Sequence, residues 1–172
     1  MLKTVLGASS IIRIQSWDIQ SAAPATIESA LGVSWPRTTG TIARGRTDVL
    51  CIGPTDWLVL ADNTDADAIL RKWFDEALEG TSFRATNVSQ ALSRIEIKGP
   101  EVRDLLAKGC SLDLHPPIFP PGRVLRTRFA GMPVIIRCSG TSTFELIVAR
   151  SYIDYLNLWL DDAALEFEMS VV

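Results

Sequence analysis

Two segments of the chain, 87 positions apart, match without a gap. When residues 51–64 are placed on residues 138–151, a cysteine meets a cysteine, a glycine follows each cysteine by two positions, and Trp57 meets Phe144. Each segment has the pattern of two strands joined by a turn and followed by a helix. Each is also preceded by a strand, a short helix and a loop. The sequence therefore predicts an α+β fold with two pseudo-repeated β-α-loop-β-β-α halves, mostly antiparallel sheets and packed helices.

The first half, about residues 9–80, shows both helical and strand periodicity. Ile12 and Ile14 alternate with polar residues and predict a strand. A helix is expected to begin near Pro24 and to end at Gly32, because proline suits a first helical turn and glycine suits a helix end. The further elements expected here are a loop over 33–46, a hairpin of strands 49–52 and 57–61, and a strongly amphipathic helix over 64–79.

The second half, about residues 90–165, repeats this order. The strand expected over 91–98 alternates isoleucines with charged residues, which predicts one face in water for Arg94, Glu96 and Lys98. A short helix that buries Val102 and two leucines should end at Gly109. The further elements expected are a meander of strands 123–129, 133–138 and 144–149, a helix from 151 to 160, and a final strand over 165–171.

Length and composition limit the class of protein. A chain of 172 residues, 47% apolar and 22% charged, is the size of one globular domain, so a single domain over 1–172 is expected. No apolar run approaches the ~20 residues of a membrane helix, and the first residues do not have the pattern of a signal peptide. Three widely spaced cysteines do not suggest a disulfide framework. We therefore expect a cytoplasmic location.

Charge is unevenly distributed along the chain. Residues 84–150 carry ten Lys or Arg against five Asp or Glu, although the whole chain has a net charge of −3. Such a division can steer a charged partner, or it can reflect two solvated faces of unlike sign. The basic residues are spread over several elements without interleaved aromatic residues, so a nucleic-acid surface is not predicted. On the strand expected at 123–129, Arg126 and Arg128 share one face and are candidates to bind an acidic partner surface or a small anion.

The segment GCSLDLHPPIFPPG, residues 109–122, contains the only histidine and four of the nine prolines. Proline fixes its own φ and restricts the residue before it, so this loop should be stiff. In one interpretation it displays apolar side chains to a partner; in the other, these side chains fold back onto the core. The candidate docking residues are Leu114, His115, Pro116, Ile118 and Phe119, together with the two arginines. A nucleophilic pair of Cys110 and His115 is a weaker alternative.

The sequence contains no recognisable catalytic constellation. It has no G-x-S-x-G or H-E-x-x-H motif, and the GTIARG segment at 40–45 lacks the order of a dinucleotide fingerprint. A single histidine is too few for an ordinary metal site. We therefore assign no catalytic, cofactor-binding or metal-binding residue and expect a binding or structural subunit.

The second half also resembles a known family. The strand, Gly-Pro turn and helix at 95–106, with the meander and helix that follow, resemble the folate-binding aminomethyltransferase fold. Within that fold, GCSLDLHPPIFPPG and the earlier GPTDWLVLAD resemble the gamma subunits of heterotetrameric sarcosine oxidases. The resemblance covers roughly residues 40–165. The K-G-C-[YF]-x-G-Q motif of related iron–sulfur maintenance proteins is broken after Cys110.

This resemblance implies a role in a complex. It implies alpha, beta and delta partner subunits, with FAD, FMN, NAD and tetrahydrofolate on those subunits and no cofactor on this chain. The complex would convert sarcosine to glycine by oxidative demethylation and pass the one-carbon unit to tetrahydrofolate, while this subunit would serve assembly. Two alternatives stay open: a free-standing folate-binding aminomethyltransferase-like protein, and the equivalent subunit of a related secondary-amine dehydrogenase such as N-methylglutamate dehydrogenase.

Overall fold

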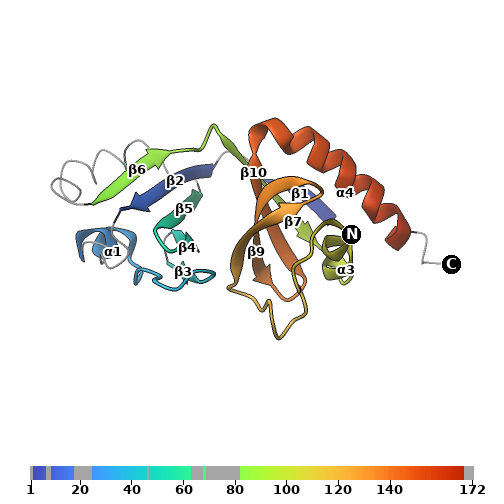
Figure 1. Ribbon diagram of the computed structural model, residues 1–172, viewed down its shortest axis with the longest axis horizontal. Coiled ribbons are helices and arrows are strands. Elements are labelled where there is room, and N and C mark those ends of the chain that lie inside the picture. Colours follow the sequence, from blue (N-terminus) through green and yellow to red (C-terminus); the bar gives the residue numbers. More distant parts are fainter. Residues whose placement is uncertain are drawn as a thin grey trace. The chain divides into compact units, whose positions relative to one another are not determined.

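A computed structural model of the chain describes residues 2–6, 9–17, 25–45, 47–62, 68 and 82–168. The chain divides into two compact units. Unit 1 combines Met1–Gly7 with Ala91–Val172, and unit 2 is Ala8–Gln90. Each unit has a five-stranded antiparallel sheet with a helix packed against it, so the predicted α+β class is confirmed (Figure 1).

Unit 1 is built on a sheet with the strand order β1-β7-β10-β9-β8. The strands are β1 (Leu2–Val5), β7 (Leu92–Lys98), β8 (Val124–Phe129), β9 (Met132–Gly140) and β10 (Thr143–Ala149). Strands β8, β9 and β10 form the predicted meander, and β7 is the predicted strand after residue 90. The sequence analysis makes no prediction for β1, which pairs with β7 at the edge of the sheet.

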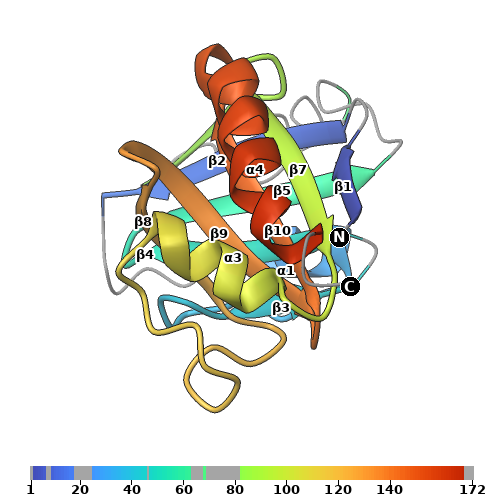
Figure 2. The ribbon, with the colours of Figure 1, turned by 90° about the vertical axis from the view of Figure 1, so that its right-hand side faces the viewer.

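Two helices lie on one face of this sheet (Figure 2). Helix α3 (Val102–Gly109) buries Val102, Leu105 and Leu106, as the sequence predicts. Helix α4 (Ile153–Glu168) follows a 3-10 turn, η1 (Arg150–Tyr152). The core between helices and sheet contains alternate residues of the strands, because successive side chains of a strand point to opposite faces.

Helix α4 is longer than the sequence predicts. The strand expected from Leu165 is wrong for residues 165–168, which are helical, and residues 169–171 lie outside the described part of the chain. Leu156, Leu160 and Ala163 are buried at helical spacing, and Phe167 continues this stripe at the edge of the core. Phe167, four residues after Ala163, continues the helical stripe, whereas Leu165 faces outward and is 54% exposed. Packing of the stripe therefore overrides the local alternation of apolar and acidic residues.

The face of β7 expected in water is only partly solvated. Arg94 is buried, as are Glu145 on β10 and Arg137 on β9. Arg94 Nε donates to one Glu145 carboxylate oxygen, and Arg137 Nη1 lies 3.5 Å from the other. The alternation on β7 therefore correctly separates two faces, but the charged face is not uniformly exposed, because a carboxylate on the neighbouring strand pairs with Arg94.

Unit 2 has the strand order β3-β4-β5-β2-β6. Its strands are β2 (Ser9–Ser16), β3 (Ile42–Arg44), β4 (Asp48–Gly53), β5 (Asp56–Asp62) and β6 (Phe83–Asn87). The predicted strand at β2 and the β4–β5 hairpin are confirmed. The loop expected over 33–46 is interrupted by β3, which pairs with β4, and the sequence analysis makes no prediction for β6. The helix expected over 64–79 lies outside the described residues except for Ala68, which is helical.

The core of unit 2 lies under helix α1 (Ala25–Leu31), the predicted first helix. Gly32 follows it with φ +65°, a left-handed conformation that suits glycine at a helix end. Trp35 and Trp57 pack with ring centroids 5.2 Å apart, and Trp57 Nε1 donates to the carbonyl of Pro36 at 2.8 Å. The buried indole of Trp57 thereby fixes the course of the chain after α1.

The β4–β5 and β9–β10 hairpins share local geometry. Cys51 Sγ donates to the carbonyl two residues later at 3.3 Å, and Cys138 Sγ does the same at 3.2 Å. The register of each hairpin shifts beside its cysteine. The Cys51 carbonyl accepts from the N–H of Gly40, and the Cys138 carbonyl accepts from the N–H of Gly122, both at 2.8 Å. Both glycines have φ +91°. In each hairpin, the segment before it is therefore hydrogen-bonded to the cysteine carbonyl through a glycine in the same positive-φ conformation.

Within the part of the chain that the structure describes, no helix has the length and apolarity needed to cross a bilayer.

Candidate functional site

The proline-rich segment after α3 forms the loop that leads into β8. The structure buries Leu114 and Phe119, which are 4% and 1% exposed, in the core of unit 1. The Phe119 ring stacks on that of Phe144 with centroids 6.1 Å apart. The expectation that the loop displays these two side chains is therefore wrong. Moving large apolar side chains out of water lowers the free energy of the folded chain, so burial is favoured over display. For Leu114 and Phe119 the alternative holds: the loop closes over its own core.

The outer side of this loop carries the other candidates. His115 and Pro116 are exposed, and Ile118 is 57% exposed. The Asp113 carboxylate accepts from the N–H of His115 at 2.9 Å, and the His115 carbonyl accepts from the N–H groups of Ile118 and Phe119, each at 2.9 Å. Tight turning of the backbone thus places an isoleucine at the tip while its neighbour points inward.

Arg103 holds the loop from the inside, a role that sequence reasoning missed. Its guanidinium donates to the carbonyls of Leu114 and Phe119, the latter at 3.1 Å, and lies 3.4 Å from the carbonyl of Thr141. It also lies 4.8 Å from the centroid of the Phe144 ring. One side chain therefore connects helix α3, both ends of the loop turn and the β9–β10 hairpin. One feature of the sequence could have indicated this role: Arg103 lies three residues before Leu106 and therefore beside the buried stripe of α3.

The surroundings of Cys110 favour its protonated thiol over the reactive thiolate. Its Sγ donates to the carbonyl of Leu106 at 3.5 Å, and burial raises the pKa of the thiol above its ordinary value. A nucleophilic cysteine needs the opposite shift, because the thiolate is the reactive form. Among the described residues, no group of three or more His, Cys, Asp or Glu side chains is placed to bind a metal ion. The geometry therefore does not favour the alternative of a Cys110–His115 pair.

Arg126 and Arg128 lie on β8, where both are exposed. They pair across the strand with Ile135 and Pro133 of β9, two residues apart, and so share one face as predicted. Arg128 Nη2 donates to the carbonyl of Gly131 at 2.6 Å, which ties it to the β8–β9 turn. The pair forms a basic stripe on an edge strand, and its role in docking stays a prediction.

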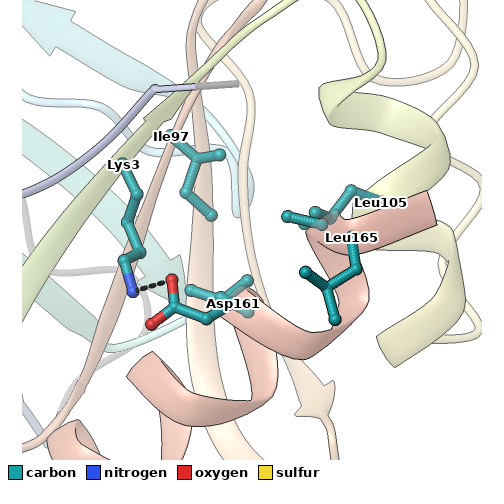
Figure 3. Close-up of a pocket in the computed structure, with 7 residues that line it drawn as sticks. Lys3, Ile97, Leu105, Asp161 and Leu165 are labelled. Carbon is teal, nitrogen blue, oxygen red and sulfur yellow. Dashed lines mark hydrogen bonds and ion pairs between the residues drawn. The ribbon is translucent and has the colours of Figure 1, made fainter. Parts of the chain in front are cut away.

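A pocket of about 280 Å³ lies between α3, α4 and the β1–β7 edge (Figure 3). Ile97 and Leu105, both buried, line its apolar part, and Leu165 stands on its α4 side. Lys3 Nζ is 2.6 Å from Asp161 Oδ1 and forms an ion pair on the opposite side from the leucines. No local sequence pattern predicts this pocket, because it depends on the placement of β1 beside β7.

Comparison with known proteins identifies first the fold class of this chain and then its protein family. The chain is similar to a solved structure of glycine cleavage system aminomethyltransferase T from Bartonella henselae, with a TM-score of 0.63 and 12% identity. This match covers 92% of this chain and 44% of that chain. The fold is therefore that of the aminomethyltransferase class. More specifically, residues 16–166 match the sarcosine oxidase, gamma subunit family, and the chain belongs to that family.

Individual relatives agree with this assignment. The chain is 30% identical to the sarcosine oxidase subunit gamma of Arthrobacter sp. over 154 residues, which are 88% of this chain and 74% of that protein. Identity to the corresponding subunit of Corynebacterium sp. (strain U-96) is 29% over the same shares. A solved chain of the heterotetrameric sarcosine oxidase from Corynebacterium sp. U-96, in complex with pyrrole 2-carboxylate, gives a TM-score of 0.86 at 26% identity. That match covers 96% of this chain and 84% of the other. The predicted family and fold are confirmed.

Proposed function

We propose that this chain is the gamma subunit of a heterotetrameric sarcosine oxidase and assembles with alpha, beta and delta subunits. The complex would demethylate sarcosine oxidatively to glycine, with the one-carbon unit passed to tetrahydrofolate on another subunit. Family membership over residues 16–166 supports this function, as does the structural similarity over 96% of the chain to a protein from such a complex.

The contribution of this chain is structural rather than chemical. The observation that carries this proposal is the set of Arg103 contacts, because they fasten the loop to α3 and to the β9–β10 hairpin without the help of a partner. A loop that is already fixed loses little conformational entropy on docking. Its exposed residues His115, Pro116 and Ile118, with Arg126 and Arg128 on β8, are proposed to contact the larger subunits. Leu114 and Phe119 support that surface from below.

The cofactors are proposed to lie on other chains. FAD, FMN, NAD and tetrahydrofolate would be bound by the larger subunits, and no catalytic residue is assigned here. A single domain over residues 1–172 and a cytoplasmic location stay predictions.

Purification from the native host tests the assignment. A tagged chain should bring down stoichiometric, flavin-bearing partner chains that are identified by mass spectrometry. Recovery of the chain without such partners would contradict the proposal. Titration with tetrahydrofolate addresses the free-standing alternative: micromolar binding by the isolated chain, about −8 kcal/mol, would favour it.

Two loop variants separate docking from chemistry in the same experiment. Ile118→Asp places a charge at the exposed tip and should reduce recovery of the partner chains. His115→Ala should leave oxidase turnover of the assembled complex within a few-fold of wild type. If His115→Ala abolished turnover while assembly stayed intact, His115 would have a chemical role and the non-catalytic interpretation would fail.

A further inference from the structure

The outer face of α4 exposes three large apolar side chains. Leu158 is 71% exposed and Leu165 is 54% exposed, and Tyr155, one turn before Leu158, is 52% exposed. We call these three residues the α4 ridge. Spacings of three and seven residues place them on one side of the helix, and the exposed Asp162 lies on the same side between Leu158 and Leu165. Scattered exposed apolar residues are ordinary, but an aligned set indicates an interaction surface.

Carboxylates flank the α4 ridge. The helix sequence IDYLNLWLDDAALEFE contains five acidic residues and no Lys, Arg or His. Asp154 and Asp161 are exposed beside the ridge, and the exposed Asp162 lies within it. Glu166 lies in the last turn, where the helix macrodipole disfavours negative charge, and Lys108 pairs with it. Because Lys3 already pairs with Asp161 and Lys108 with Glu166, Asp154 and Asp162 are the carboxylates of this face that favour a basic counterpart.

The pocket beside α4 adjoins the α4 ridge. Leu165 belongs to both, and Asp161 of the Lys3–Asp161 pair stands at the polar side of the pocket (Figure 3). Its volume of about 280 Å³ is large enough to receive an apolar side chain. Interfaces commonly gain most of their binding energy from a few apolar anchors in such pockets. An apolar residue on a segment lying along α4 can reach this one.

We propose that the α4 ridge and its pocket dock a basic amphipathic helix supplied by one of the larger subunits. The partner helix would place apolar residues on Leu158 and Leu165, insert one apolar side chain beside Leu105, and direct Lys or Arg toward Asp154 and Asp162. A second copy of this chain, meeting the ridge symmetrically, would oppose like charges. Anionic membrane surfaces would be repelled in the same way. The inference rests on the proposed function, because it takes its partner from that complex.

Direct capture identifies the partner segment. In the full chain, Leu158 is replaced by the photoreactive residue p-benzoylphenylalanine, the chain is assembled with its native partner subunits, and cross-linked peptides are sequenced by mass spectrometry. The expected product is a peptide of a larger subunit with helical apolar spacing and at least two flanking Lys or Arg. A cross-link to an acidic peptide or to a second copy of this chain, or no cross-link in an intact complex, would overturn the proposal.

Binding measurements then test the two kinds of contact. Wild-type chain is titrated into a complex of the other subunits purified without it. Leu158→Asp should raise Kd at least tenfold, whereas the conservative Leu158→Met should stay within threefold. Asp162→Lys should raise Kd about three- to tenfold at low salt and less at high salt, because exposed charges are screened. Asp104→Lys, the same change at an exposed position of α3, is the matched control and should have a smaller effect.

The outcomes distinguish this inference from the proposed function. If wild-type chain does not bind the other subunits, the proposed function fails, and this inference fails with it. If wild type binds and Leu158→Asp binds equally well, the function stands and the α4 proposal is wrong. Thermal unfolding of each variant checks that it is folded, and Leu158 is exposed enough that its replacement should leave unfolding unchanged.

Discussion

Replacing Arg103 by alanine should destabilise unit 1 more than removal of any exposed arginine. The substitution removes the donor for two loop carbonyls, those of Leu114 and Phe119, and the cation over the Phe144 ring. A hydrogen bond to a charged group contributes about 1.5–3 kcal/mol. Because Arg103 is only partly buried, the lower value is appropriate, so the two bonds contribute about 3 kcal/mol.

The Phe144 contact adds to this estimate. A cation over an aromatic ring at a partly exposed site is worth about 0.5–1 kcal/mol. The total loss is therefore about 3.5–4 kcal/mol. For a chain of this size, a loss of 1 kcal/mol lowers the unfolding midpoint by roughly 2–4 °C, so the midpoint should fall by about 10 °C. Arg103→Lys, with a compact ammonium in place of the planar fork, should lose about half as much.

Thermal unfolding followed by circular dichroism measures this effect in the purified chain. Arg128→Ala is the matched control, because it removes an exposed arginine with one bond to a turn carbonyl and should cost less than about 1 kcal/mol. Thermolysin, which cuts before large apolar residues, should cleave residues 114–119 faster in Arg103→Ala than in wild type. Equal midpoints and equal cleavage for Arg103→Ala and Arg128→Ala would refute the role of Arg103 as the residue that holds the loop.

Two further predictions concern residues near this loop. Gly109→Ala would place a Cβ atom 2.4 Å from the buried Phe129 ring, and urea unfolding should show a loss of about 1–3 kcal/mol from overpacking; an unchanged midpoint would contradict the close contact. Because burial raises the pKa of Cys110, less thiolate exists at a given pH. The rate of iodoacetamide labelling, followed by peptide mass spectrometry, should therefore increase only at higher pH than it does for a free peptide thiol. Equal labelling rates for Cys110 and the peptide at neutral pH would disprove this.

The elements that the sequence predicts well are those in which one local pattern dominates. Alternation of apolar and polar residues locates β2 and β7, and helical spacing around Val102 and Leu105 locates α3. The predicted final strand is wrong because Phe167 continues the buried helical stripe of α4, while Leu165, which belongs to the same local alternation, is left exposed. Strand β1 is short and lies next to β7, about ninety residues later in the chain, so no local pattern identifies it.

The sequence predicts which segment forms the candidate site, but it does not predict which of its side chains face the core and which face outward. The prolines predict a stiff loop, but they do not determine which apolar side chains turn inward. That choice depends on Phe144 and Arg103, which come from other elements. The α4 pocket could not be predicted for the same reason, because its lining combines residues 3, 97, 105 and 165. The sequence pattern identifies the buried and exposed faces of single helices and strands, whereas the loop surface and the pocket depend on contacts between elements that are distant in the chain.

The pairing of β1 with β7 has a consequence for biosynthesis. Strand β1 leaves the ribosome before unit 2, whereas β7 leaves after it, and at about 5–20 residues per second the interval is on the order of ten seconds. During that interval unit 2 can fold, while the first strand of unit 1 has no hydrogen-bonding neighbour. Fusions or tags placed before Leu2 would therefore interfere with the last stage of maturation rather than the first.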